Sequence, residues 1–321
     1  MQRIFRVCVL MLGVLLLAGT TANAQDLRAQ LAKLPSNALE GYATPMLNGW
    51  VTDLNSAFFS TADLHGFLGF DVSVKLATTL VKDEDKTYVL ALPSTIGAYT
   101  AGTLPTNYPS SVTLPTAVGE KGDFAVKTNN GLTTITTVPG GFGLAAIGSP
   151  LVIPQLTVGL PFGLEVMGRY IPTIKLPNDM GKVNFVGGGL RYNVGHFIPV
   201  VPVDIAIHFM TQKLNLKGSD GTDFASATAT AYGLSVSKKL LILTVYGAFQ
   251  LESGKFTLDS YTIPATAGYL GNGQVAGFTV TEKNKSRATV GVRVGLPLVY
   301  VHAEYSFAKT NVAAAGIGVG L

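Results

Sequence analysis

The sequence is poor in charge and contains a single cysteine. Only 13% of its 321 residues are Asp, Glu, Lys or Arg, about half of the usual ~25%. This cysteine, Cys8, lies in an N-terminal segment that we predict below to be a cleaved signal peptide. The mature chain would then contain no cysteine, which excludes disulfides, thiol nucleophiles and cysteine-ligated metals. After residue 20 no run of about 18 uninterrupted apolar residues occurs, which excludes membrane-spanning helices.

The first 24 residues have the pattern of a secretory signal peptide. Arg3 and Arg6 precede an apolar stretch over residues 7–18, and Ala22-Asn23-Ala24 is a small-residue cleavage site. We therefore predict export across the inner membrane of a bacterium and a mature chain that starts at Gln25, the alternative being an uncleaved anchor. Two of the 23 basic residues lie in this segment, which leaves 21 against 19 acidic ones and excludes a nucleic-acid partner.

What the chain has in abundance is apolar residues, at 47%, and glycine, at 37 positions. The apolar residues alternate with polar ones in segments of about ten residues. Over residues 70–80, for example, Phe70, Val72 and Val74 share one face and Asp71, Ser73 and Lys75 the other. Segments of this length with one apolar face are typical of barrel strands that span a bilayer.

Two predicted hairpins separate the faces in the same way. A two-residue turn at Lys238-Lys239 pairs Val236 with Leu241, and a turn at Leu296-Pro297 pairs Val294 with Val299. A one-residue slip in either hairpin would mix apolar and polar side chains on one face. The pattern therefore favours a barrel with an apolar outside over a soluble sandwich.

The alternating segments predict an all-β fold, an antiparallel outer-membrane β-barrel of about 10–14 strands over residues 69–321. Ten segments are clear: 69–80, 151–159, 163–173, 182–194, 203–215, 224–236, 240–252, 286–295, 298–308 and 312–321. Strand-like stretches at 88–92, 132–138 and 278–281 leave twelve or fourteen strands open. The long connections, 81–150 and 253–285, are expected outside the cell and the short ones in the periplasm.

Residues 25–68 differ from the rest. Leu27, Leu31 and Leu34 have helical spacing up to Pro35, and Leu47, Val51, Leu54 and Phe58 repeat it after Pro45. We predict an N-terminal helical plug inside the barrel. The alternative is a helix pair in the periplasm or on the membrane surface.

The C-terminal residues 314–321 resemble the terminal-strand signal that the outer-membrane barrel assembly machinery reads. Gly316, Val319 and Leu321 match its glycine and its two final hydrophobic positions, whereas Ala314 and the final Leu depart from it. This resemblance implies that the assembly machinery is a partner. A last strand that pairs with the first would leave no open edge.

The chain also resembles an uncharacterised family of secreted bacterial proteins, known only as a domain of unknown function. The resemblance rests on Tyr42-Ala43-Thr44-Pro45, Leu47-Asn48-Gly49-Trp50, Leu64-His65-Gly66, Gly69-Phe70-Asp71, Pro154-Gln155, Gly159-Leu160-Pro161-Phe162-Gly163 and Arg169-Tyr170-Ile171-Pro172. The layout of a plug followed by a barrel is similar to that of the long-chain fatty-acid and aromatic-hydrocarbon transporters of outer membranes. None of the ligand residues of that family has a counterpart here.

The polar residues of the inward faces are candidates for lining the lumen or a ligand. They are Trp50, Glu165, Arg169, Asp204, His208, Arg293, His302 and Glu304. Glu165 and Arg169 lie about 13 Å apart along one strand at ~3.3 Å per residue, so we expect them to pair with neighbouring strands, for example with Arg191. No strand-turn-helix carries a G-x-S-x-G elbow, and the four histidines lack metal-ligand spacing. We expect no catalytic residue, metal or cofactor.

Barrel size limits the function. Eight strands leave a lumen filled by side chains, and open aqueous porins use 16–18. A plugged barrel of intermediate size suits passive uptake of one hydrophobic or amphipathic small molecule, with outer-membrane lipid around it. The alternative is a non-transporting structural or adhesive surface barrel that acts through its long loops. An embedded lipid hydrolase is a third possibility.

Overall fold

The computed structural model describes residues 27–144, 148–175, 181–195 and 202–320; the predicted signal peptide, residues 1–24, and Leu321 lie outside them. Ten antiparallel strands form one closed barrel, because β12 pairs with β13 as well as with β11. The strands are β1 (Phe70–Thr79), β8 (Leu151–Leu160), β9 (Leu164–Lys175), β10 (Lys182–Asn193), β11 (Asp204–Lys217), β12 (Asp223–Leu240), β13 (Leu243–Leu258), β17 (Ser286–Gly295), β18 (Val299–Phe307) and β19 (Val312–Gly320).

The last strand closes the barrel on the first. Nine residue pairs join β19 to β1, from Asp71 opposite Gly320 to Thr79 opposite Val312. The prediction of an antiparallel barrel is confirmed at ten strands, the low end of the expected range. The additional strand-like stretches are β2 (Thr87–Ala91), β7 (Thr134–Pro139) and β16 (Phe278–Thr281), none of which enters the closed ring; β16 extends the sheet at the end of β13.

The predicted faces are correct. Asp71, Ser73 and Lys75 are buried inside the barrel, whereas the intervening apolar side chains of β1 point outward. The same division holds around the ring, and many outward side chains are more than one-third exposed, among them Leu156, Leu190, Phe209, Tyr232, Phe249, Val292 and Val301. The outside of the barrel is therefore an apolar belt.

Both predicted hairpin turns were placed wrongly. Leu240 pairs with Leu243, so the turn is Leu241-Ile242 and β12 runs straight through Lys238-Lys239. In the second hairpin Val294 lies opposite Val301, and the turn is Pro297-Leu298. In both hairpins the observed pairing is shifted from the predicted one by an even number of residues. An even shift leaves every side chain on the same face of the sheet, so the pattern of polar and apolar residues cannot distinguish the two registers.

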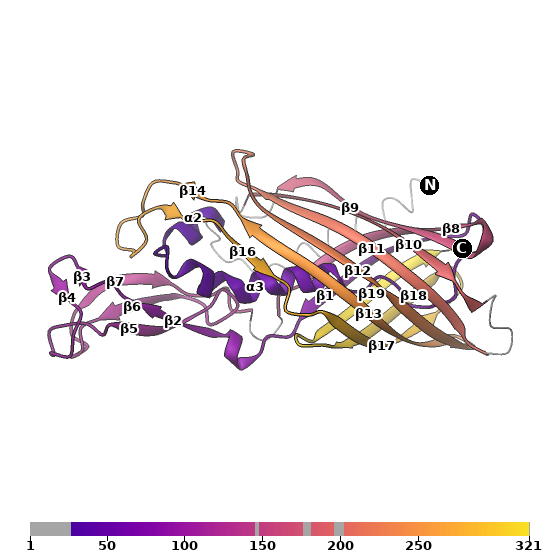
Figure 1. Ribbon diagram of the computed structural model, residues 1–321, viewed down its shortest axis with the longest axis horizontal. Helices are drawn as coiled ribbons and strands as arrows, with labels where there is room; N and C mark the ends of the chain where they lie inside the picture. The colour runs from indigo at the N-terminus through magenta and orange to yellow at the C-terminus, as the bar shows by residue number, and fades with distance from the viewer. Residues whose placement is uncertain (1–26, 145–147, 176–180, 196–201, 321) are drawn as a thin grey trace.

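The two ends of the barrel differ (Figure 1). Short connections join β8 to β9, β12 to β13 and β17 to β18 at what we call the short-turn end. Long connections join β1 to β8 and β13 to β17 at the opposite, long-loop end. They contain β2, β3 (Thr95–Ile96), β4 (Tyr99–Thr100), β5 (Ser111–Pro115), β6 (Asp123–Lys127), β7, β14 (Tyr261–Thr262), β15 (Gln274–Val275), β16 and the 3-10 turn Asp83–Asp85.

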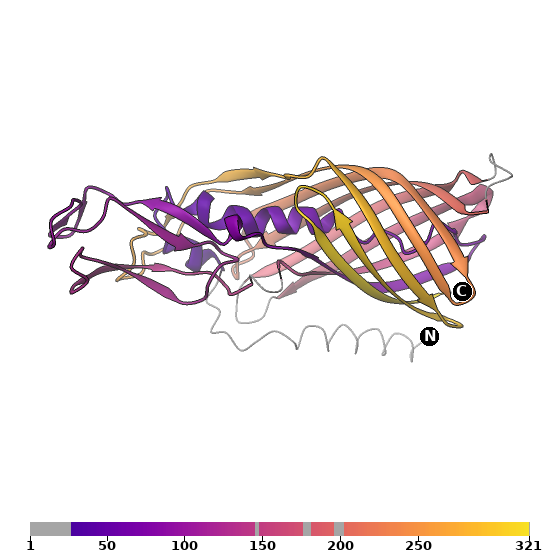
Figure 2. The ribbon, with the colours of Figure 1, turned by 90° about the horizontal axis from the view of Figure 1, so that it is seen from below.

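These long connections pack into one body, which we call the loop body (residues 80–144, 148–150 and 259–285). The helices α2 (Leu27–Ala32) and α3 (Leu39–Leu54) contribute to its core. Figures 1 and 2 show α3 between the loop body and the barrel. The predicted helix boundaries were wrong, because α3 starts before Pro45 and ends before Phe58. Among the described residues no helix has the length and apolarity of a membrane span.

The register of the closing strands is open to a direct test. The sequence has no cysteine after Cys8, so two engineered cysteines have no competitor. We expect the pair Val72→Cys and Val319→Cys, which are opposed across β1 and β19, to form a disulfide on oxidation in the folded protein, because opposed strand residues have Cα separations that a disulfide spans. Non-reducing gel mobility detects the bond. The pair Val72→Cys and Ala315→Cys, four positions out of register, is the control. Equal cross-linking of both pairs would contradict the closure described here.

Candidate functional site

The lumen has an apolar half and a polar half. Toward the long-loop end the inward side chains are apolar and belong to the core that surrounds α3, among them Ile153, Phe185, Leu214, Phe224 and Phe256. Toward the short-turn end they are charged or carry amides, and they face the chain that follows α3. We call this chain, residues 55–66, the lumen segment.

Helix α3 occupies the apolar half and ties the loop body to the barrel. Tyr42 donates a hydrogen bond to the Gly140 carbonyl (2.9 Å), and its own carbonyl accepts one from Ala117 (2.9 Å). Asn48 accepts a hydrogen bond from the Lys283 backbone N–H (2.9 Å). Trp50, a predicted lumen residue, packs against Phe256 with 6.1 Å between ring centroids. Trp50 thus belongs to the helix packing at the mouth of the barrel.

Arg169 is the central contact of the polar half. Its guanidinium donates to the backbone carbonyls of Leu54 (3.2 Å), Ser56 (3.0 Å) and Ala57 (2.9 Å). It also donates to the side-chain oxygens of Gln155 (2.9 Å) and Gln212 (3.0 Å). An arginine has five N–H donors, so all of them are used. The side chain is 1% exposed, and within the described chain no carboxylate pairs with it, so the prediction of an ionic partner was wrong for Arg169.

Bonds of the same kind reach the lumen segment from most of the wall. The strands β8 to β13, β17 and β18 each contribute an inward side chain, so eight of the ten strands hold residues 54–65. Gln155 donates to the Phe58 carbonyl (2.9 Å), Gln250 to the Asn55 carbonyl (2.8 Å), and Glu304 accepts from the Ala57 N–H (3.1 Å). The buried backbone of an extended segment has its hydrogen bonds satisfied by the barrel wall.

Glu165 does have the predicted partner. Its carboxylate lies 2.8 Å from Nη1 of Arg191, on the neighbouring strand, and both side chains are buried. The other carboxylate oxygen accepts from the backbone N–H of His65 (3.1 Å) and lies 2.7 Å from its Nδ1. Arg191 also donates to the Thr61 carbonyl. The pair therefore holds the lumen segment near the short-turn end.

His302 and Glu304 meet through a residue that the sequence analysis missed. The Tyr246 hydroxyl donates to Glu304 (2.9 Å) and lies 3.2 Å from Nδ1 of His302. All three side chains are buried. A hydroxyl, an imidazole and a carboxylate are thus adjacent, but the hydroxyl is a phenol in the barrel interior and the carboxylate is bonded to the Ala57 N–H. The arrangement positions the lumen segment.

The other predicted residues line the same lumen. The ring of His208 lies 4.9 Å from that of Phe59. Asp204 is half-buried and accepts from Ser237 (3.4 Å), whose Oγ in turn accepts from the Ala62 N–H (2.9 Å). Arg293 lies with its guanidinium 3.7 Å from the Tyr300 ring centroid and donates to Ser60 Oγ (3.3 Å).

Inward glycines make room for the large side chains of the wall. A Cβ on Gly318 would lie 2.4 Å from the Tyr300 ring, one on Gly316 would lie 2.4 Å from His302, and one on Gly291 2.3 Å from Tyr246. These rings lie flat over the glycines of neighbouring strands. The axis of the barrel is thereby left free for the lumen segment.

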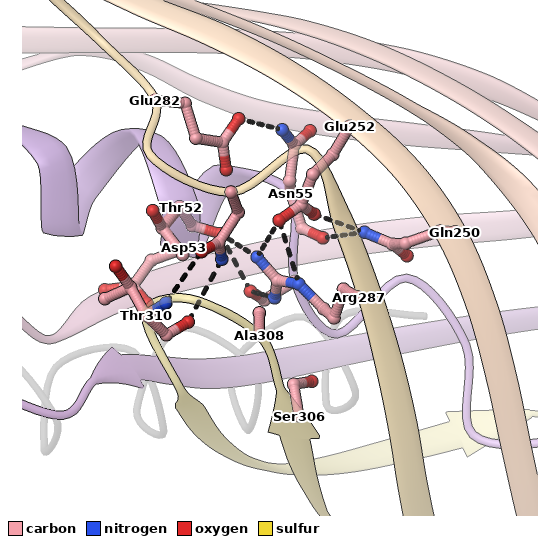
Figure 3. A network of polar contacts seen from close by, with 12 residues as sticks. Thr52, Asp53, Asn55, Gln250, Glu252, Glu282, Arg287, Ser306, Ala308 and Thr310 are labelled. Atoms are coloured by element: carbon pink, nitrogen blue, oxygen red, sulfur yellow. Dashed lines mark hydrogen bonds and ion pairs between the residues drawn. The ribbon is translucent and has the colours of Figure 1, made fainter.

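A second polar network anchors the junction of α3 and the lumen segment (Figure 3). Arg287 pairs with Glu252 (3.0 Å) and donates to the Thr52 carbonyl (2.9 Å). Glu282 accepts from Asn55 (3.0 Å). Burial raises the pKa of Glu282 to about 8, and the charge of Glu252 acts in the same direction.

Asp53 lies beside this network. Its carboxyl accepts from Thr79 (2.9 Å) and from Ser149 (3.4 Å). It is fully buried, and burial raises its pKa to about 8, against which the nearby hydroxyls and the charge of Arg287 act only in part. A carboxyl with such a raised pKa is largely protonated at neutral pH.

The residues missed by the sequence analysis are Gln155, Gln212, Gln250, Tyr246 and Arg287. Each occupies an inward position of an alternating strand, so the strand period would have identified them. The three glutamines donate to backbone carbonyls of residues 54–58, and Arg287 donates to the carbonyl of Thr52. No side-chain pattern indicates such partners. In the part of the chain that the structure describes, no group of three His, Asp or Glu side chains could hold a metal ion.

Comparisons with known proteins give one family and loose structural similarity. The model of a family described as "Family of unknown function (DUF6588)" matches residues 1–321, and no curated protein matches the chain. The toluene transporter TodX of Pseudomonas putida aligns at 7% identity with a TM-score of 0.26, over 81% of this chain and 89% of its own. A loop-deletion mutant of the outer-membrane protein OmpT of Vibrio cholerae aligns at 12% identity with a TM-score of 0.25, over 78% of this chain and 99% of its own. The β domain of the Bordetella autotransporter BrkA aligns at 11% identity with a TM-score of 0.28, over 79% of this chain and 100% of its own. Alignments this loose carry no inference about the activity of this chain.

Arg169 should be essential for holding the lumen segment. We expect Arg169→Gln to lower the free energy of unfolding by about 3 kcal/mol or more, because several buried carbonyls lose their donors. The midpoint temperature of heat-modifiable gel mobility measures the effect. Arg169→Lys is the informative control, since it keeps the charge but loses the five-donor fork. A lysine variant as stable as the wild type would show that charge alone is needed.

Asp53 and Glu282 should make the protein less stable as pH rises. Their folded pKa values, about 8, lie above the ordinary pKa values of 3.8 for Asp and 4.5 for Glu, so the folded state binds more protons than the unfolded one between pH 4 and 8. Stability is therefore lost through this range, by at most about 1.4 kcal/mol per pH unit for each group. Asp53→Asn should flatten the pH profile of the unfolding midpoint. Asp83→Asn, at an exposed site, should leave it unchanged, and an equal profile for all three proteins would refute the assignment.

Proposed function

The chain belongs to DUF6588, a family of unknown function, and from its own geometry we propose that it is a closed, non-conducting barrel of the bacterial outer membrane that presents the loop body at the cell surface. The single observation that carries this proposal is the bonding of eight wall strands to one continuous segment, residues 54–65, seven of them through its backbone groups and β17 through the Ser56 hydroxyl.

Membrane insertion is supported by the outside of the barrel. An apolar belt surrounds a ring with no free edge, which satisfies backbone hydrogen bonds without water. Outer-membrane lipid is the partner that such a belt fits. The β19 strand, with the terminal signal over residues 314–321, is proposed to bind the barrel assembly machinery. The predicted signal peptide supplies the route of export.

A closed lumen is supported by the space that remains beside the lumen segment. A cavity between residues 55–59 and the inward side chains of Gln250, Arg287 and Glu304 measures about 10 Å³. This is about the volume that a single water molecule needs. A cavity of this size cannot hold a small organic molecule, which supports the proposal that the lumen segment acts as the plug.

A surface role is supported by the order of the loop body. Its core is continuous with α3, so the loops are held rigidly relative to the barrel. At its far end Leu104 and Leu132 are 62% and 84% exposed on neighbouring loops, which Asn129 joins through hydrogen bonds to the Gly102 and Leu104 carbonyls (both 2.8 Å). Exposed apolar side chains on a rigid support fit adhesion to, or docking of, a partner at the cell surface.

Passive uptake of a hydrophobic or amphipathic small molecule is the second candidate. It is favoured by the nature of the plug contacts, which are hydrogen bonds and ion pairs without a covalent tie. The candidate requires residues 55–66 to leave the lumen while the barrel stays closed. Inward residues such as Glu165, Arg169, His208 and Glu304 would then line the passage.

An engineered disulfide between the lumen segment and the barrel wall, which we call the lock, distinguishes the non-conducting barrel from the uptake channel. Thr61 Oγ1 on the lumen segment lies 3.1 Å from Ser237 Oγ on β12, so Thr61→Cys with Ser237→Cys can form a disulfide. We expect wild-type protein from the outer-membrane fraction to show no conductance in planar bilayers, and the oxidised lock to behave identically. Arg169→Gln with Arg287→Gln should conduct, because the lumen segment is released, and the lock should suppress that conductance until it is reduced.

Uptake by living cells tests the transport candidate directly. Labelled oleate and labelled naphthalene are offered to cells that produce wild-type or locked protein. Uptake that requires the wild type and is blocked by the oxidised lock alone would establish transport and overturn the non-conducting role. Thr61→Ser with Ser237→Ala, which cannot cross-link, is the matched control for the substitutions themselves.

A further inference from the structure

The short-turn end of the barrel has a second, larger cavity that the proposed function does not use. It measures about 410 Å³ and lies between the end of the lumen segment and two adjacent hairpin turns, Leu241-Ile242 and Pro297-Leu298. The volume falls in the range of small-molecule sites, roughly 300–1,000 Å³. The turns are neighbours because β13 pairs with β17.

One wall of this cavity is cationic. Lys239 and Arg293 line it, and in the described chain no carboxylate lies within ion-pair distance of either. Two other arginines of the lumen wall have carboxylate partners, Arg191 in Glu165 and Arg287 in Glu252. Of the described residues that line the cavity, Asp63 alone carries a carboxylate. Its pKa is raised, chiefly by burial and then by Asp204. One carboxylate offsets two cations only in part.

The two hairpin turns give the cavity an apolar lining, and one leucine in each turn is held in an unusual backbone conformation. Leu241 and Leu298 have φ angles of 57° and 71°, the left-handed region in which Gly or Asn is usual. Leucine is strained there, because its Cβ lies too close to the following carbonyl oxygen. Both side chains are well exposed, at 92% and 59%, so no folded core accounts for them. Two adjacent turns thus maintain an apolar side chain where a polar residue would be more stable.

We propose that this cavity binds an anionic amphiphile, with the headgroup at Lys239 and Arg293 and the hydrocarbon chain along Leu241, Ile242 and Leu298. The Arg293 guanidinium is oriented for this role by its position over the Tyr300 ring, 3.7 Å from the centroid, and by its bond to Ser60. The apolar turns continue the outward belt, through Leu240, Leu243 and Val299, down to the cavity mouth. An amphiphile can therefore reach the site from the surrounding lipid.

The shared chemistry, a negative headgroup on a hydrocarbon chain, fits a free fatty acid or an anionic phospholipid. Native mass spectrometry of the purified protein in a nonionic detergent measures binding of oleate, oleyl alcohol, phosphatidylglycerol and phosphatidylcholine. We expect one molecule of the preferred anionic probe, bound at least tenfold more tightly than its uncharged or zwitterionic counterpart. Tighter binding of phosphatidylglycerol identifies the membrane as the source, and tighter binding of oleate identifies a free acid. The proposal is overturned if neither anionic probe exceeds its counterpart.

Variants test the two walls separately. Lys239→Gln with Arg293→Gln should lower affinity for the anionic probe at least tenfold, to the level of its counterpart. Lys213→Gln with Lys255→Gln, the same charge change at exposed positions far along the barrel, should have no effect. Equal affinity of the two double variants would overturn the proposal.

Substitution of Leu241 and Leu298, whose backbone is in the left-handed conformation, separates an effect on binding from an effect on stability. Leu241→Asn with Leu298→Asn should leave the heat-modifiable transition unchanged or raise it, because Asn suits this conformation, yet should weaken binding at least tenfold. Phe162→Asn, at another left-handed turn position outside the cavity (φ 64°), is the matched control. Unchanged binding in the leucine variant would refute the site. The two tests have separate readouts, because conductance reports on the lumen beside residues 55–59 and probe affinity reports on Lys239, Arg293 and the two turns. A conducting wild type would overturn the proposed function, whereas only the binding measurements decide this site.

Discussion

The buried guanidinium of Arg169 is the interaction on which the polar half of the lumen depends. A backbone segment that enters a barrel brings N–H and C=O groups that cannot remain without partners. Arg169 supplies five donors from one rigid fork, and three backbone carbonyls accept from it. One belongs to Leu54 at the end of α3, and the other two belong to Ser56 and Ala57 of the lumen segment. The neighbouring amides of Gln155, Gln212 and Gln250 continue the same pattern. The wall is polar where backbone lies against it and apolar where the side chains of α3 do.

This division of the lumen explains why the loop body is ordered. Helix α3 already has its backbone groups bonded, so it can lie against apolar side chains and extend that core out of the barrel mouth. The two long connections then pack on the helix from both sides, through the Ala117–Tyr42 and Lys283–Asn48 hydrogen bonds. The N-terminal residues thus link wall, lumen and loop body, and a change at Arg169 is expected to be transmitted to all three.

The two ends of the barrel differ in how their connections are packed. The long-loop end builds a folded body with its own core, and the raised pKa values of Asp53 and Glu282 there follow from the depth of that packing. At the short-turn end two described turns expose leucine in strained conformations. They lie beside Lys239 and Arg293, which have no carboxylate within ion-pair distance in the described chain. Strain that no packing accounts for is a physical reason to look for a ligand. The two ends are therefore proposed to meet different partners, a surface ligand at one and an amphiphile from the membrane at the other.

The sequence alone determined the barrel and which side chains point inward, because a strand has a period of two and each face meets one environment throughout. It indicated ten clear strands but left twelve or fourteen open, and it offered Arg191 only as an example of a charged partner for Glu165. It did not determine the hairpin turns, since registers that differ by an even number of residues preserve the faces. Nor did it identify the partners of Arg169, Gln155 and Gln250. Those partners are backbone groups, which every residue carries alike, and only the tertiary structure decides which of them lie within reach.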